Sequence, residues 1–298
     1  MNLNPLPALP PRALDAHKGD CGRVLLIAGS DGMSGAVALA ATAALRSGAG
    51  YVEIICPATL LPSLTESVPA AMVHRCGDSK QQQLQAADLP TMLALAARCQ
   101  AIVIGPGLGA PHAPFWLPQL LTKLQATQPD LPVLIDADGL NQLAASNVDL
   151  GICTPNMILT PHPGEAARLL GWSSAAVVQK DRAAAIATLS KMTGATIILK
   201  GAGTLVQQQS NTCWQNSTGN VGMATAGSGD VLSGHIGALL ASGLEPFQAA
   251  RLGVHLHGLA GDLYAAEWGM DGLTASDLAK WISKAMRLWR ENPTEVRA

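Results

Sequence analysis

The chain has 298 residues, of which 48% are hydrophobic and only 13% charged, and its formal net charge is −2 at pH 7. This composition can fill a large hydrophobic core, and it provides no basic surface for nucleic acid or an anionic membrane. The longest apolar run, from Gly35 to Leu45, is shorter than the roughly 18–20 residues that a membrane-spanning helix needs. Six scattered cysteines without a CxxC pair indicate free thiols in a reducing compartment. We therefore expect a soluble cytoplasmic protein that binds neither nucleic acid nor membrane.

Residues 1–16 carry four prolines and lack the basic start and apolar core of a secretory signal peptide. Because proline fixes the backbone and removes a hydrogen-bond donor, this composition disfavours a helix or a central strand. We expect residues 1–16 to form an extended N-terminal arm laid across the surface.

Short aliphatic and β-branched runs recur along the chain, and each is followed by a turn rich in glycine or polar residues. The runs are apolar on both faces, which is typical of strands in a parallel sheet covered by helices on each side. Helical patterns follow the first turn, over Ala36–Ser47, and dominate the chain after Ser233. Alternation of this kind predicts right-handed βαβ units. The sequence thus predicts an α/β fold with a mostly parallel central sheet and helices on both faces, in one domain over residues 1–298. The predicted strands are Arg23–Ala28, Tyr51–Cys56, Ala101–Ile104, Val133–Ile135, Met157–Leu159 and Thr196–Leu199, and the C-terminal helices are Ser233–Ala241, Pro246–Ala266 and Ala275–Leu288.

The turns that follow the strands are expected to share one edge of the sheet, where open α/β sheets bind their ligands. Two of them, Gly29–Ala36 and Gly105–Gly109, are rich in glycine, but neither fits the dinucleotide pattern GxGxxG with an acidic residue about 20 positions later. Each could be a plain turn when taken alone. Their occurrence at the same edge favours a binding site.

The strongest single motif is the small-residue segment Ala226, Gly227, Ser228 and Gly229, which is followed by Asp230 and an apolar helical pattern. Small residues let several backbone N–H groups point at one position, and the start of a helix attracts anions. Asp230 could then act as a general base beside a bound phosphate. An ordinary aspartate N-cap after a tight loop is the structural alternative.

Lys200 stands at the end of a predicted strand and is followed by Gly201, Ala202, Gly203 and Thr204. A lysine beside two glycines suits a nucleotide, because the backbone can approach a ribose or phosphate closely. The order of residues differs from a Walker A loop, in which the lysine follows the glycines. A glycine hairpin leading to Leu205 explains the segment equally well.

His162 lies between two prolines in the segment Thr160–Glu165, which leads into another helical pattern. The prolines restrict the backbone on both sides, so His162 is held rigidly and is a candidate ligand contact. Glu165 falls in the first helical turn, where the helix dipole stabilises a carboxylate and where it could steer Mg²⁺ through water. Ordinary helix-entry chemistry is the alternative.

Four further polar residues follow a predicted strand or lie on a predicted C-terminal helix. Of Asp136 and Asp138, we expect one to reach the site and the other to cap a helix that begins near Asn141. His255 and His257 are two positions apart on a predicted helix and so lie on different faces, which disfavours a metal pair. We expect both histidines to be packed or hydrogen-bonded.

Taken in order, these motifs resemble the ribokinase-like NAD(P)H-hydrate dehydratases from about His17 to Leu278. The Thr160–Glu165 segment distinguishes the chain from related kinases, which carry asparagine where His162 stands. Two positions depart from the common pattern: Cys21 replaces an aromatic residue, and Val221 replaces a proline. The matching segments are Lys18–Gly19 with Gly22–Val24, Gly29–Ser30 with Gly35–Ala36, Gly105–Gly109, Asp136–Asn141, Thr160–Glu165, Lys200–Thr204, Asn216–Asn220 and Ala226–Gly234.

The resemblance implies a ribokinase-like fold and a lyase that repairs hydrated NADH and NADPH of the S epimer. The enzyme would phosphorylate the C6 hydroxyl from ADP or ATP with Mg²⁺ and then release phosphate, restoring the ring. ADP is favoured as the nucleotide. The implied roles are Asp230 as catalytic base and substrate contact; Ala226, Gly227, Ser228 and Gly229 as anion hole; Lys200, Gly201, Ala202, Gly203, Thr204 and Gly229 as nucleotide contacts; Ala36, Gly107 and His162 as substrate contacts; and Glu165 as an organiser of Mg²⁺ through water.

Many members of this family carry an additional epimerase domain, for which this chain has no room. The resemblance therefore implies a separate NAD(P)H-hydrate epimerase as functional partner, and it implies a homo-oligomer such as a tetramer. Two other functions compete with the dehydratase. A kinase of the same fold would phosphorylate a small vitamin-precursor alcohol, whereas a catalytically silent nucleotide-binding regulator would not need Asp230.

Overall fold

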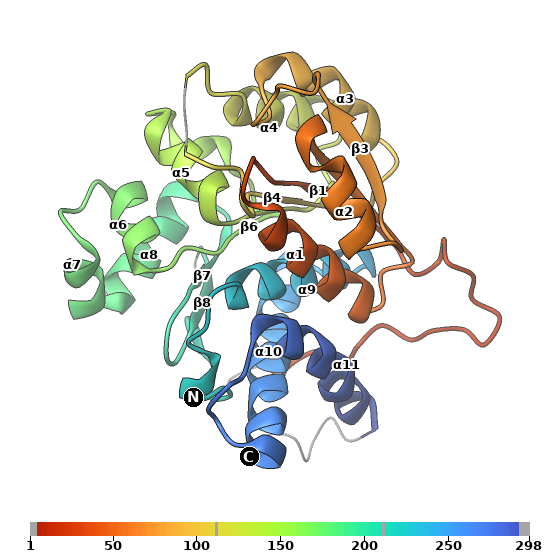
Figure 1. Ribbon diagram of the computed structural model, residues 1–298. Helices are drawn as coiled ribbons and strands as arrows, with labels where there is room; N and C mark the ends of the chain where they lie inside the picture. The colour runs from red at the N-terminus through yellow and green to blue at the C-terminus, as the bar shows by residue number, and fades with distance from the viewer. Residues whose placement is uncertain (1–4, 111–112, 210–211, 292–298) are drawn as a thin grey trace.

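The protein is organised around one central β-sheet (Figure 1), here in a computed structural model that describes residues 5–110, 113–209 and 212–291. Within these residues nine strands pair in the order β3-β2-β1-β4-β5-β6-β7-β8-β9. Strands β1 to β7 are parallel, while β8 and β9 each pair antiparallel with their predecessor. The mostly parallel sheet expected from the sequence is confirmed. The strands are β1 Arg23–Ile27, β2 Tyr51–Pro57, β3 Met72–Cys76, β4 Ala101–Ile104, β5 Val133–Ile135, β6 Met157–Leu159, β7 Thr196–Leu199, β8 Leu205–Gln208 and β9 Trp214–Gln215.

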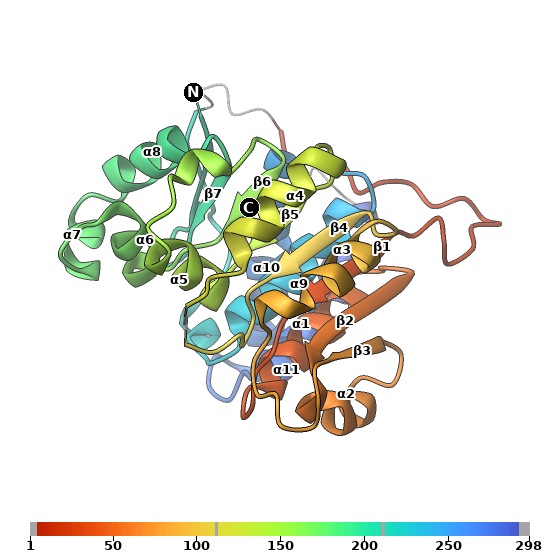
Figure 2. The same cartoon turned by 90° about the horizontal axis from the view of Figure 1, so that it is seen from above.

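Helices cover both faces of this sheet, as Figures 1 and 2 show. Side chains of one buried cluster connect the sheet to α1, α2, α9, α10 and α11, and a second cluster connects its other face to α3 through α8. Among the described helices, none is long and apolar enough to cross a membrane. The helices are α1 Ser34–Arg46, α2 Leu61–Ser67, α3 Leu89–Ala96, α4 Leu117–Thr127, α5 Ala137–Ala145, α6 Pro163–Leu170, α7 Ala175–Lys180, α8 Arg182–Thr193, α9 Ser228–Ala241, α10 Pro246–Trp268 and α11 Ala275–Glu291.

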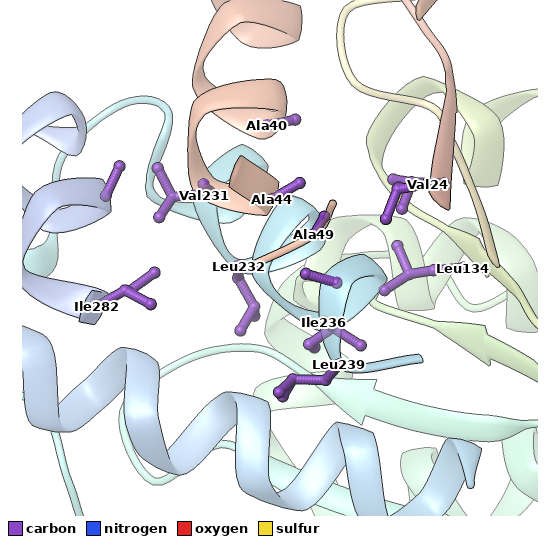
Figure 3. Close-up of a cluster of buried hydrophobic side chains, with 14 of the residues drawn as sticks. Val24, Ala40, Ala44, Ala49, Leu134, Val231, Leu232, Ile236, Leu239 and Ile282 are labelled. Carbon is purple, nitrogen blue, oxygen red and sulfur yellow. The ribbon is translucent and has the colours of Figure 1, made fainter. Parts of the chain in front are cut away.

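Helix α9 is held in the core between α1, α11 and the sheet. Figure 3 shows Val231, Leu232 and Ile236 of α9 directed among apolar side chains of these neighbours. The approach to α1 is so close that a Cβ on Gly234 would lie 1.9 Å from the Ala40 carbonyl oxygen. Glycine is therefore required at this crossing. Tight packing on every side fixes the direction in which the N-terminus of α9 points.

Several element boundaries differ from the sequence predictions. The polar edge strand β3 was missed, because its composition, which includes His74 and Arg75, gives no apolar strand pattern. Helix α5 begins at Ala137 rather than near Asn141, and α9 begins at Ser228, five residues before Ser233. In both cases the first helical turn contains polar residues of the site. These residues therefore lie at helix N-termini.

The N-terminal arm is attached to the body at separate points. Leu9 is buried, and the indole N–H of Trp289 in α11 donates to the Pro7 carbonyl at 3.1 Å. Arg12 donates to the carbonyl of Gly48. Beyond Arg12 the chain turns out into solvent, where Leu14 is fully exposed (Figure 1). Residues 1–4 of the expected arm lie outside the described residues.

Candidate active site

The glycine-rich loops after β1 and β4 meet at the carboxyl edge of the sheet. Strands β1 and β4 are neighbours although two strands separate them in sequence, so the order of the strands reverses here, at the position where open α/β sheets bind their ligands. The Gly29 N–H donates to the Pro106 carbonyl at 3.0 Å, and Ser30 Oγ donates to the Gly107 carbonyl at 2.9 Å. A Cβ on Gly107 would lie 3.2 Å from Cβ of Ala36. The structure thus brings together Ala36 and Gly107, the two predicted substrate contacts.

Asp136 connects four segments of the site. It follows β5, and its side chain is only 1% exposed. Oδ1 accepts hydrogen bonds from Lys200 Nζ at 2.7 Å and Thr160 Oγ1 at 2.6 Å, while Oδ2 accepts from Ser233 Oγ at 2.7 Å. Burial opposes ionisation of Asp136, but Lys200 and the two hydroxyls outweigh it, so the pKa lies below its usual value. Asp136 is therefore a charged anchor for Lys200 and for α9.

Lys200 is partly buried directly after β7, with its ammonium group between two carboxylates. Besides Asp136, it lies 3.8 Å from Oε2 of Glu165. Burial favours the neutral amine, but Asp136 and Glu165 reverse that effect and raise the pKa of Lys200. A Cβ on Gly229 would lie 3.5 Å from Nζ. The positive charge is thus held against the first turn of α9.

The N-terminus of α9 carries the predicted anion hole. Gly227 is the N-cap, with a φ of 87° that only glycine adopts without strain. Among the described residues, no protein acceptor is hydrogen-bonded to the amide N–H groups of Ala226, Gly227 and Gly229, whereas that of Ser228 contacts the Thr225 carbonyl at 3.4 Å. Free amides at a helix N-terminus are suited to an anion.

Asp230 is the third residue of α9, so the alternative of an aspartate N-cap is wrong. Burial, together with the nearby charge of Asp136, raises the pKa of Asp230 to about 7, although Lys200 acts in the opposite sense. These effects outweigh the helix dipole, which favours a carboxylate here. A carboxyl group with a pKa near neutrality is suited to accept and release a proton.

His162 and Glu165 form a capping box at the start of α6. Nδ1 of His162 accepts from the Gly164 N–H at 2.9 Å, and Oε2 of Glu165 accepts from the His162 N–H at 2.8 Å. Burial lowers the pKa of His162, and the positive charges of Lys200 and Arg168 lower it further. Its ring is half exposed, and its Nε2 lies 3.3 Å from Oε1 of Glu165. The expected helix-entry role is present, and the ring remains accessible to a ligand.

Asp136 and Asp138 divide their roles differently from the expectation. Asp136 occupies the N-cap position of α5 without a side-chain cap bond. Asp138, in the first turn, accepts from the Gly109 N–H at 2.9 Å and from Asn141 Nδ2 at 3.1 Å. Asp136 therefore reaches the site, and Asp138 fixes the loop after β4.

A cavity of about 550 Å³ opens beside the anion hole. All the predicted nucleotide contacts, Lys200–Thr204 and Gly229, line it. Lys200–Thr204 connects β7 to the antiparallel strand β8, so the predicted glycine hairpin is also real. The other walls are residues 216–224 except Gly222, hereafter the 216–224 loop, together with Ser228 and Leu232 of α9 and Val254, His257 and Gly258 of α10.

The contribution of α10 was missed from the sequence. His257 lines the cavity with Nε2 3.0 Å from the Ser228 carbonyl, and burial lowers its pKa to about 4. His255 faces the opposite side and packs edge-on against Trp289 with ring centroids 5.1 Å apart. The two histidines are on different faces, as expected. The sequence signal that could have revealed this contribution was the pair Gly258 and Gly261 in a helix interior, because glycines there indicate a close approach of another segment.

Comparison with known proteins agrees with this arrangement. The family model of the NAD(P)H-hydrate dehydratases matches residues 24–284. A bifunctional NAD(P)H-hydrate repair enzyme of Coxiella burnetii is 45% identical over 272 residues, which cover 91% of this chain and 52% of that protein. The chain therefore spans about half the length of the bifunctional relatives that it matches.

Two other proteins match over most of both chains. An ADP-dependent (S)-NAD(P)H-hydrate dehydratase of Neisseria meningitidis is 41% identical over 91% of this chain and 88% of its own. The structure of an ADP/ATP-dependent NAD(P)H-hydrate dehydratase of Bacillus subtilis, co-crystallised with ATP and Mg²⁺, is 32% identical with a TM-score of 0.76 and covers 94% of each chain. The fold is thus ribokinase-like, and the chain belongs to the NAD(P)H-hydrate dehydratase family.

Proposed function

We propose that this protein is a nucleotide-dependent dehydratase that restores NADH and NADPH from their hydrated S epimers. One observation carries the proposal. The cavity lined by Lys200–Thr204 meets the N-terminus of α9, where Asp230 has a pKa of about 7. A nucleotide in this cavity would place its terminal phosphoryl group at the free amides, beside a general base. The names of the Neisseria and Bacillus relatives support this activity.

Asp230 would start the reaction by taking the proton of the C6 hydroxyl. The hydroxyl oxygen then bonds to the terminal phosphorus as the bond to the leaving nucleotide breaks. Loss of phosphate from C6 and of a proton from C5 restores the C5–C6 double bond. Phosphate leaves far more readily than hydroxide, which is the chemical purpose of the nucleotide.

Backbone amides of residues 226–229 would stabilise the charge on the transferring phosphoryl group. Lys200 adds a positive charge that Asp136 holds in place. This charge cannot be lost at neutral pH, because the pKa of Lys200 is raised by the two carboxylates beside it. Positioning and electrostatic stabilisation account for most of the catalysis in phosphoryl transfer.

The hydrated dinucleotide would lie against the loops after β1 and β4. Ala36 and Gly107 are adjacent there, and Gly107 has no side chain that would keep a ligand away from its backbone. His162 has an accessible ring, and its fixed tautomer offers the Nε2 proton as a donor. These three residues are therefore proposed as substrate contacts.

The donor set fits Mg²⁺ bound mainly through phosphate and water. Among the described residues, no group of three or more His, Cys, Asp or Glu side chains could hold a metal. Mg²⁺ at nucleotide sites takes one or two carboxylates and keeps several waters. Glu165 already accepts from the His162 N–H, so it would hold the ion through water. The ion would neutralise phosphate charge during transfer.

The remaining expectations are proposals of the same kind. We propose one domain over residues 1–298, ADP as the favoured nucleotide, and a cytoplasmic homo-oligomer such as a tetramer. We also propose a separate epimerase as functional partner. The bifunctional names of the longer relatives support a link between the two repair activities.

An assay on hydrated NADH with ADP or ATP and Mg²⁺ tests the function. Recovery of the near-ultraviolet absorbance of NADH and release of inorganic phosphate are followed together, with Asp230→Asn as the control. Equal, nucleotide-dependent recovery of both signals, lost in the control, is the expected result. Absence of both signals with either nucleotide would refute the dehydratase and favour a kinase of a small alcohol.

A further inference from the structure

The 216–224 loop forms one wall of the cavity, and its hydrogen bonds lead to a single carboxylate on α10. Oδ2 of Asp262 accepts from the Gly219 N–H at 2.7 Å, and Oδ1 accepts from Asn220 Nδ2 at 2.9 Å. Asn220 Oδ1 in turn accepts from the Gly222 N–H at 3.0 Å and caps the short helix Val221–Met223. Asp262 thus fixes the loop both directly and through Asn220.

The loop also lies directly on the surface of α10. Thr218 Oγ1 donates to the His255 carbonyl at 2.8 Å. A Cβ on Gly258 would lie 2.3 Å from Thr218 Oγ1 and 2.7 Å from the Thr218 carbonyl carbon. A Cβ on Gly261 would lie 2.5 Å from Sδ of Met223. The two glycines therefore leave a flat surface on which the loop rests beside Asp262.

We infer that Asp262 is a positioning residue that holds the 216–224 loop in the conformation that binds the nucleotide. The inference rests on the proposed function, because it takes the cavity to be the nucleotide site. Asp262 does not line the cavity, whereas the residues that it holds, Gly219 and Asn220, do. It therefore acts through the loop and not on the reacting atoms.

The expected effect is on nucleotide binding and not on the chemical step. If only a fraction of the molecules holds the loop in its binding conformation, the apparent dissociation constant rises by the inverse of that fraction. Loss of both contacts in Asp262→Ala, with the loop ordered in about one molecule in ten, raises the KM and Kd for the nucleotide about tenfold. Because Asp230 and α9 are untouched, kcat at saturating nucleotide stays unchanged.

The experiment compares wild type, Asp262→Ala, Asp262→Asn and Gly258→Ala with a control on the same helix, Glu267→Ala. Glu267 is exposed and contacts Trp268 and Lys284, not the loop. Nucleotide affinity is measured by calorimetry with ADP and with ATP, and the hydrate assay gives kcat and KM. Amide hydrogen exchange in residues 216–224 is followed without nucleotide. Asp262→Asn keeps one acceptor oxygen and gives a folded variant with a smaller effect.

We expect weaker binding, unchanged kcat and faster exchange in the Asp262 variants, weaker binding in Gly258→Ala, and no change in Glu267→Ala. Wild-type affinity or wild-type exchange in Asp262→Ala overturns the inference and leaves the proposed function intact. Failure of the wild type to bind either nucleotide refutes the proposed function and the inference that rests on it.

Discussion

The raised pKa of Asp230 predicts that this side chain destabilises the folded protein at neutral and alkaline pH. Burial and the neighbouring carboxylate of Asp136 raise the pKa from 3.8 to about 7 in the folded state. Well below pH 4 the carboxyl group is protonated in both folded and unfolded chains, so it contributes no difference. Between these two pKa values the unfolded chain loses its proton while the folded chain keeps it. Stability therefore falls as pH rises and levels off above pH 7.

The size of this effect follows from the pKa difference. Each pKa unit corresponds to about 1.4 kcal/mol, so ionisation of Asp230 costs about 4 kcal/mol of folding free energy at its limit. About 3 kcal/mol of this cost arises between pH 5 and pH 8. Asp230→Asn removes the titration and with it the whole pH-dependent cost. The variant should be inactive and yet gain about 3 kcal/mol of stability over wild type from pH 5 to pH 8.

Urea unfolding of both proteins at pH 5 and pH 8 measures this difference. A constant difference in unfolding free energy between an amide and a protonated carboxyl at position 230 cancels when the two pH values are compared. The titrations of His235 and His257 occur in both proteins and cancel as well. Asp130→Asn, in an exposed loop outside the site, is the matched control and should follow the wild type. For wild type we also expect kcat/KM to fall below about pH 7 as Asp230 gains a proton. Stability curves that stay parallel for wild type and Asp230→Asn would refute the proposed basicity of Asp230.

Two further substitutions test how the site is held. Lys200→Met leaves the carboxylate of Asp136 buried without its cation, which should lower the free energy of unfolding in urea by about 3–5 kcal/mol. The double variant Lys200→Met with Asp136→Asn should recover most of this loss. Additive losses in the double variant would contradict the pairing. Gly227→Ala places a Cβ 2.4 Å from Cδ1 of Leu39 at a φ of 87° and should lower kcat about a hundredfold by tilting the amides of α9. Gly269→Ala, with a φ of 86° and open space around it, should cost about 1–2 kcal/mol and leave kcat unchanged. Equal kcat values in the two glycine variants would show that the α9 turn does not position the reacting group.

The fold could be predicted because its signals are local. Four of the six predicted strands have the predicted boundaries, from Ala101–Ile104 to Thr196–Leu199, since each is a short apolar run that ends at a turn. Strand β3 could not be found in this way, because an edge strand faces solvent and needs no apolar pattern. The early starts of α5 and α9 were missed for a related reason. Their first turns carry polar site residues, which mask the helical periodicity.

The site could be predicted only as a set of candidate residues, because its contacts are distant in sequence. Asp136 is 64 residues from Lys200 and 97 from Ser233; the parallel order of β5, β6 and β7 brings Lys200 to it, and the packing of α9 against the sheet brings Ser233. The motif alone indicated a lysine suited to a nucleotide and gave no sign of its partner, whereas the structure pairs Lys200 with Asp136. The charge of this lysine is therefore partly compensated before any ligand arrives. The proposed nucleotide would accordingly depend on the free amides of α9, and on the proposed Mg²⁺, to balance the rest of its charge.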